Sequence, residues 1–179
     1  MIPGSVLTIS RYTREHAAQV RQQLLDVYAE VYAGQGDSDP FHSIPRFTQR
    51  LNGHSSNPGW SCVIGAVGED VVGFAYGRPD TAADWNDVTD ASEDIETFHK
   101  NTFGLCEIMV REPWRGTGIA RTLHDELMRD RPEARASLLV DETHPRVRAT
   151  YERWGYRGVG QLRPAEDAPQ YDQMVLDLA

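Results

Sequence analysis

Two glycines, Gly116 and Gly118, stand between an apolar stretch and a run with helical spacing, and this arrangement could bind a phosphate ligand. Glycine has no Cβ atom, so the backbone at such a turn can come close to an anion. The start of a helix leaves several N–H groups without partners and carries about half a positive charge. The turn before the helix therefore predicts a site for a pyrophosphate.

The spacing of the glycines separates the classes of phosphate ligand. A dinucleotide-binding turn needs G-x-G-x-x-G, and the last position is Arg121 here, so that class is excluded. A P-loop needs a lysine after its second glycine, and none is present. The pattern [R/Q]-x-x-G-x-[G/A] fits through Arg115, Gly118 and Ala120. An apolar strand before this pattern and an apolar helix face after it strengthen the match.

A second block follows about thirty residues later. An apolar strand at 138–140 leads through His144 into a short helix that contains Tyr151, and Gly155 and Tyr156 come after it. With these two blocks in this order, the chain resembles the GNAT superfamily of acyl-CoA-dependent N-acyltransferases over about residues 105–160. The family often has an asparagine before this last helix, where the chain has His144.

The resemblance implies an α/β (α+β mixed) fold: a mostly antiparallel mixed sheet of six to seven strands, flanked by about four helices. In that family, two parallel strands of the sheet splay apart, and acyl-CoA lies between them. These strands are expected at 105–110 and 137–140, because the helix that joins them predicts a parallel crossover.

The resemblance also assigns the residues that contact acetyl-CoA, the expected co-substrate. The strand backbone would pair with the pantetheine arm and point N–H groups at the thioester oxygen. The turn would hold the pyrophosphate, and two residues of the second block would complete the site. The full set is Ile108, Met109, Val110, Arg115, Gly116, Thr117, Gly118, Ile119, Ala120, His144 and Tyr151.

Tyr151 is the candidate acid that protonates the CoA thiolate, by resemblance to the family's helix tyrosine. A phenol with a pKa of about 10 stays protonated at neutral pH and can donate. The competing interpretation is packing, because Val147, Tyr151 and Trp154 have the spacing of a buried helix stripe.

Glu107 is the candidate general base, acting directly or through water. It shares a strand face with Leu105 and Met109, and a carboxylate between two apolar residues indicates either a role in proton transfer or exposure at the sheet margin. His144, His54 and His42 are alternative bases, because histidine titrates near neutral pH.

The remaining elements follow from periodicity and turn signals, and they form one domain over residues 1–179. Thr13 is expected to cap the first helix, whose apolar face is Ala17, Val20, Leu24, Val27 and Val31. Pro145 and Gly155 mark the ends of the last helix. Strands are expected at 6–10, 60–67, 71–76, 105–110, 137–140, 156–161 and 173–178, and helices at 43–51, 118–129 and 145–154.

An acidic segment from Asp80 to Lys100 carries seven carboxylates against one lysine, together with Trp85 and Phe98. The corresponding connection is typically short in related proteins, so residues 80–104 are predicted to be an insertion that acts as a substrate lid. Its charge could attract a cationic amine. The alternative is a solvated acidic surface.

Composition narrows the function classes. The net charge of −9 argues against nucleic-acid binding, which depends on clustered Lys and Arg. No apolar run approaches the ~20 residues of a membrane span, and no signal peptide is evident. The two cysteines and six histidines show no metal-ligand spacing, so no metal is expected, and buried thiols favour a cytoplasmic protein.

The sequence thus predicts an N-acetyltransferase that acts by direct attack in a ternary complex, because no cysteine lies where an acyl-enzyme would form. A catalytically silent acyl-CoA-binding module is the main alternative, and a domain that binds another phosphate ligand is a weaker one. The acceptor stays open among polyamines, aminoglycosides, amino acids and protein amines. Monomer and homodimer are both compatible with the sequence.

Overall fold

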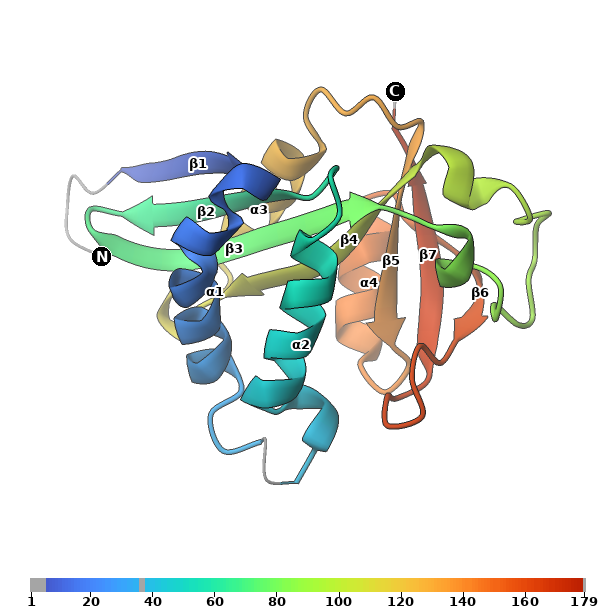
Figure 1. The fold of residues 1–179 in the computed structure, drawn as a ribbon, viewed down its shortest axis with the longest axis horizontal. Coiled ribbons are helices and arrows are strands. Elements are labelled where there is room, and N and C mark those ends of the chain that lie inside the picture. The colour runs from blue at the N-terminus through green and yellow to red at the C-terminus, as the bar shows by residue number, and fades with distance from the viewer. Residues whose placement is uncertain (1–5, 36–37, 179) are drawn as a thin grey trace. The chain divides into compact units, whose positions relative to one another are not determined.

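The computed structural model describes residues 6–35 and 38–178, which form a seven-stranded mixed sheet and four α-helices (Figure 1). The strand order is β1-β2-β3-β4-β5-β7-β6. The strands are β1 (Leu7–Thr13), β2 (Ser61–Val67), β3 (Asp70–Pro79), β4 (Thr102–Val110), β5 (Arg135–Asp141), β6 (Arg157–Leu162) and β7 (Tyr171–Asp177). The helices are α1 (Ala17–Val31), α2 (Ile44–Ser55), α3 (Ile119–Met128) and α4 (Pro145–Arg153). The expected fold class is confirmed.

The chain divides into two compact units that share β4. The first unit comprises residues 1–78 and 106–129, and the second comprises residues 79–105 and 130–179. The prediction of one domain over the whole chain stays a prediction.

In the first unit, α1 and α2 cover one face of the strands and α3 packs on the other. The α1 and α2 face holds a core of buried side chains that includes Ile64, Phe74 and Met109. On the opposite face, Gly65 of β2 pairs with Gly73 of β3, and a Cβ on either would come within 3.4 Å of the Leu123 side chain. Two glycines side by side therefore let α3 lie close to the strands.

The N-terminal region forms the predicted strand and helix, but the predicted cap is wrong: Thr13 caps a short 3-10 turn, and His16 is the N-cap of α1. The first strand continues to Thr13, whose backbone N–H donates to Nδ1 of His16 at 3.4 Å in a short 3-10 turn. Helix α1 begins after this turn, and Val20, Leu24 and Val27 of its predicted apolar face are buried.

In the second unit, α4 and the segment 80–101 lie on opposite faces of β5, β7 and β6. Arg148 of α4 contacts Asp172 of β7, and a Cβ on Gly158 would lie 2.7 Å from the Arg148 guanidinium. On the other face, Trp85 and the aromatic ring of Phe98 pack against Val159 and Val175.

The parallel pairing of β4 with β5 is short. It covers three positions, from Thr102 with Arg135 to Gly104 with Ser137, although both strands continue beyond them. Strands β5, β7 and β6 pair antiparallel, as expected.

The acidic segment differs from its prediction in two respects. Residues 102–104 belong to β4, so the connection ends at Asn101 rather than at residue 104. The segment also contains two 3-10 turns and buries Trp85 and Phe98, which anchor it to the second unit. Asp80 adds to this anchoring, because its carboxylate accepts hydrogen bonds from Trp85 Nε1 at 3.0 Å and from Ser137 Oγ at 2.5 Å.

Candidate active site

The glycine turn between β4 and α3 has the geometry that close approach of an anion requires. Gly116 and Gly118 have φ angles of +73° and +86°, a region that residues with a Cβ rarely adopt. A Cβ at either position would find no atom within 4 Å, so the space beside this backbone is open. Gly118 caps α3, and the first N–H groups of the helix face the same end.

Side-chain contacts hold this turn in place. Nε of Arg115 donates to the carbonyl of Val110 at 3.2 Å, and Oγ1 of Thr117 donates to the carbonyl of Trp114 at 2.5 Å. The hydrogen bond from Arg115 connects the turn to β4. Arg115 therefore has a structural role in addition to its place in the sequence pattern.

The side chains and the backbone of the three strand residues assigned to the pantetheine arm have different roles. Met109 is buried in the core under α1 and α2, whereas Ile108 and Val110 are half-buried. The N–H of Arg111, just beyond the strand, donates to Val72 at 2.8 Å. The buried side chain of Met109 and the hydrogen bond of Arg111 therefore hold the strand in place. The predicted contacts with acetyl-CoA would come from its backbone groups.

Glu107 of β4 lies in the first unit and is largely shielded from solvent. Its side chain is 18% exposed, and Oε1 lies 3.7 Å from Nη2 of Arg50 on α2. Burial raises the pKa of Glu107 to about 7, and the nearby guanidinium of Arg50 opposes the shift. Exposure at the sheet margin does not describe this carboxylate, which can gain and lose a proton near neutral pH.

Two tyrosines surround the carboxylate. Tyr28 of α1 and Tyr76 of β3 are both fully buried. Burial and the charge of Glu107 raise the pKa of Tyr28 to about 12 and the pKa of Tyr76 well above its ordinary value. Both phenols therefore stay protonated, and they neither compete for the proton nor add charge.

The three alternative histidine bases occupy different positions. Nδ1 of His54 lies 3.2 Å from the hydroxyl of Tyr76, within the first unit. His42 pairs with Asp39 at 2.5 Å and stacks on the Tyr32 ring. His144 is exposed at the start of α4, with Nδ1 3.5 Å from Asp141.

Tyr151 lies on α4 in the second unit. Among the described residues of α4 none is buried, and Val147 is 45% exposed, so the competing interpretation of a buried stripe does not fit this helix. The Tyr151 ring meets Trp154 and Tyr156 edge to face, at centroid distances of 5.4 and 5.8 Å. The phenol is thus positioned by two rings, the half-buried Trp154 and the buried Tyr156.

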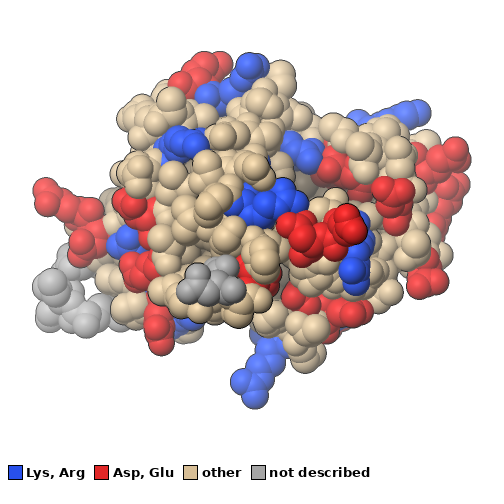
Figure 2. Space-filling view, turned by 60° about the horizontal axis from the view of Figure 1, so that its bottom comes forward, with Lys and Arg blue, Asp and Glu red and all other residues tan. Residues whose placement is uncertain are grey.

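The acidic segment surrounds a hollow of about 390 Å³ in the second unit. Apolar side chains of Trp85, Val88 and Ile95 line it together with Glu93, Asp94 and Glu96. Glu93 is paired through both oxygens with Arg157, at 2.8 and 3.1 Å. Figure 2 shows acidic side chains gathered on the right, the side where Figure 1 draws the segment 80–101.

The structure brings some predicted site residues together and leaves others in the second unit. Glu107, Ile108–Val110 and the turn from Arg115 to Ala120 all belong to the first unit, whereas His144 and Tyr151 belong to the second.

Sequence reasoning missed Arg50, Tyr28 and Tyr76 as neighbours of Glu107. The sequence does contain a signal for Arg50. This charged residue lies between Phe47 and Leu51 in the sequence, and these two residues form the buried face of α2. The partner strand, however, is more than fifty residues away along the chain.

Neither a cluster of metal ligands nor a membrane-spanning helix occurs among the described residues. Across 6–35 and 38–178, no group of three or more His, Cys, Asp or Glu side chains could hold a metal ion. No helix in the same residues has both the length and the apolar character needed to cross a bilayer.

The sequence profile of the acetyltransferase (GNAT) family matches residues 21–156, which is most of the chain. The protein belongs to the GNAT acetyltransferase family. The matched region contains both sequence blocks that carried the resemblance, and the expected family is confirmed. No curated protein sequence matches the chain significantly.

Solved structures of GNAT proteins share the fold at low sequence identity. An aminoglycoside 6'-acetyltransferase type Ii is 19% identical, with a TM-score of 0.65 over 95% of this chain and 96% of that one. The ribosomal-protein-S18-alanine N-acetyltransferase of Escherichia coli is 16% identical, with a TM-score of 0.62 over 97% and 95%. The PaiA N-acetyltransferase of Thermoplasma acidophilum, in complex with coenzyme A, is 12% identical, with a TM-score of 0.58 over 97% and 99%.

Proposed function

We propose that the protein transfers an acetyl group from acetyl-CoA to a primary amine, by direct attack within a ternary complex. Membership of the GNAT acetyltransferase family supports the reaction type, and the geometry of Glu107 carries the mechanism. A carboxylate with a pKa of about 7 in a largely apolar environment provides a base that is partly ionised at neutral pH.

The steps assign one role to each group. Glu107 accepts a proton from the ammonium form of the acceptor, and the free amine nitrogen attacks the thioester carbonyl carbon. Backbone N–H groups of 108–110 stabilise the negative charge that develops on the carbonyl oxygen. The C–S bond then breaks, and the hydroxyl of Tyr151 donates its proton to the CoA thiolate. The acetylated nitrogen gives its surplus proton to the resulting phenolate, so the amide forms and Tyr151 is restored.

The glycine turn would hold the pyrophosphate of acetyl-CoA. The open space beside Gly116 and Gly118 and the N-terminus of α3 fit an anionic group. Covalent catalysis through Cys62 is disfavoured, because this thiol is buried and burial raises its pKa.

The test is an acceptor screen with acetyl-CoA and purified protein. The panel contains polyamines, aminoglycosides, free amino acids, and peptides with a free N-terminus or a lysine. Release of the CoA thiol, together with the gain of one acetyl group by mass spectrometry, is the expected result for at least one class. Tight binding of acetyl-CoA with no acetylated product across the whole panel would support the alternative of a silent acyl-CoA-binding module.

A further inference from the structure

The Arg50 side chain is held from three directions in the first unit. Nη1 donates to the carbonyl of Phe41 at 2.7 Å, and Nη2 donates to the hydroxyl of Tyr28 at 3.2 Å. The guanidinium carbon lies 4.2 Å from the centroid of the Phe41 ring and 5.8 Å from that of the Phe47 ring. The side chain is only 16% exposed. A side chain constrained in this way has little freedom to leave its position.

Glu107 is the group toward which this fixed cation is directed. Its Oε1 lies 3.7 Å from Nη2 of Arg50, which is an ion-pair distance. Of the described residues, Arg50 alone gives the carboxylate an ion pair or hydrogen bond, so the second oxygen stays available to an incoming amine.

The other groups around the carboxylate are neutral or belong to separate pairs. Tyr28 and Tyr76 are protonated phenols. His54 is placed against the Tyr76 hydroxyl, and Asp39 pairs with His42. Cys106, the next residue along β4, is half-buried. The charge balance at Glu107 therefore depends on Arg50.

We propose that Arg50 is a positioning residue for the reaction: anchored by Phe41 and Tyr28, it keeps the Glu107 carboxylate ionised and oriented with one oxygen free for the amine. The inference rests on the proposed function of Glu107 as the base. Without a nearby cation, a carboxylate in this apolar environment would hold its proton through neutral pH and could not accept one.

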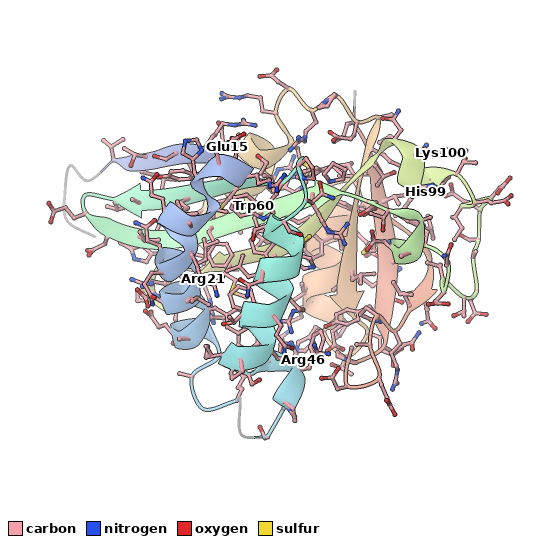
Figure 3. All side chains as sticks on the ribbon, viewed as in Figure 1. Glu15, Arg21, Arg46, Trp60, His99 and Lys100 are labelled. Atoms are coloured by element: carbon pink, nitrogen blue, oxygen red, sulfur yellow. The ribbon has the colours of Figure 1, made fainter. Side chains whose placement is uncertain are left out.

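The expected contribution of each anchor follows from its contacts. Removal of the guanidinium in Arg50→Gln takes away the charge and both hydrogen bonds. In Arg50→Lys the charge remains, but the planar group that bridges Phe41 and Tyr28 is lost. Tyr28→Phe keeps Arg50 and removes only one of its acceptors. Arg46→Gln is the matched control, because Arg46 lies on the same helix (Figure 3) and its Nη1 donates to Oε1 of Gln49.

The experiment measures the titration of Glu107 directly, by NMR of the side-chain carboxyl carbon in protein with labelled glutamate, assigned with Glu107→Gln. Arg50→Gln should raise the midpoint by one pH unit or more, a tenfold loss of the ionised fraction at pH 6. Arg50→Lys should restore part of it, Tyr28→Phe should produce a smaller rise, and Arg46→Gln should leave it in place. The pH profile of kcat/KM should move with the midpoint.

Two failures can be distinguished. An unchanged Glu107 midpoint in folded Arg50→Gln protein overturns the inference, whatever the activity of the enzyme. If Arg50→Gln does not fold, an unchanged midpoint in folded Tyr28→Phe protein overturns the anchoring of Arg50, because the Tyr28 hydroxyl is one of its two hydrogen-bond acceptors. A midpoint that moves while the kcat/KM profile stays fixed leaves Arg50 as the group that sets the ionisation of Glu107, and removes Glu107 from the proposed role of base.

Discussion

A Cβ atom on Gly73 would lie 2.4 Å from the carbonyl oxygen of Met109, a distance that real Cβ atoms essentially never show. Strand β3 and the neighbouring β4, which is assigned to the pantetheine arm, thus approach each other closely at this point, and only glycine allows it. The contact is with backbone, so it cannot be relieved by a change of rotamer. Gly73 therefore fixes the position of the backbone on which the proposed oxyanion contacts depend.

We expect Gly73→Ala to lower the free energy of unfolding by about 2 kcal/mol, as overpacking against a fixed backbone does. Gly53→Ala is the control, because Gly53 lies in α2 and a methyl group added there would have no atom within 4 Å. Alanine there should stabilise the helix by about 0.5–1 kcal/mol. Urea unfolding of both variants tests this, and equal midpoints would contradict the close approach of Gly73 to Met109.

Local patterns allowed most of the fold to be predicted. The buried face of α1 and the glycine turn before α3 are short-range signals, and the structure has both. The end of the acidic segment was predicted less accurately. Thr102 and Phe103 belong to β4 because they pair with β5, and this pairing cannot be read from the local sequence.

The surroundings of the candidate base were harder to predict. Glu107 could be selected from its apolar neighbours in sequence, but its partner Arg50 comes from α2 and depends on tertiary packing. The spacing of Val147 and Tyr151 fits a core stripe, yet α4 has no buried residue among those described. Periodicity gives the face of a helix, but it does not say whether another element covers that face.

The raised pKa of Glu107 predicts a specific pH dependence of stability. The folded state binds the proton more tightly than the unfolded chain, whose pKa is near 4.5. The wild-type protein therefore loses stability as pH rises from about 4.5, and the loss is complete above the folded pKa of about 7. Glu107→Gln lacks this loss, so its unfolding free energy relative to wild type should rise over that range by at most about 3 kcal/mol.

Denaturant unfolding at pH 5, 6, 7 and 8 measures this difference, and Glu112→Gln on the exposed turn after β4 serves as the control. A constant difference between Glu107→Gln and wild type across the series would mean that the carboxylate is not desolvated in solution.

The glycine turn offers a test that separates backbone strain from ligand contact. Gly118→Val should lower the affinity for acetyl-CoA at least tenfold, about 1.4 kcal/mol, because the side chain would occupy the space beside the pyrophosphate. Gly68→Val is the matched control: Gly68 also has a positive φ, of +62°, and open space, but it lies in the β2–β3 turn. Calorimetry should show that only Gly118→Val affects binding, and equal loss in both variants would point to strain.

The proposed acid can be removed with little change in packing. Tyr151→Phe keeps the ring contacts with Trp154 and Tyr156 and loses the hydroxyl. Its kcat should fall by about 10²-fold or more, while the Kd for acetyl-CoA changes little. Tyr156→Phe removes a hydroxyl from the same aromatic cluster and should retain kcat. An unaltered kcat in Tyr151→Phe on an accepted amine would leave the tyrosine with a packing role alone.

The acidic segment contains carboxylates of two kinds, and only one kind is suited to a test of steering. Oδ2 of Asp84 accepts from both the N–H and the hydroxyl of Thr81, and Glu93 pairs with Arg157, so neutralising either would disturb local structure. Asp87, Asp90 and Glu96 are exposed. Asp90 has a φ of +52°, which asparagine tolerates well, so amide replacements should keep the backbone of all three.

If these exposed charges attract a cationic acceptor, the variant Asp87→Asn/Asp90→Asn/Glu96→Gln should lower kcat/KM for that acceptor and leave the affinity for acetyl-CoA unchanged. Long-range attraction is screened over about 10 Å at 0.1 M salt, so wild-type kcat/KM should fall as ionic strength rises. The neutralised variant should lose much of this dependence, and a neutral acceptor should show none in either protein. Parallel salt profiles for the two proteins would identify the segment as a solvated acidic surface, because a charge that attracts the acceptor must contribute to the slope.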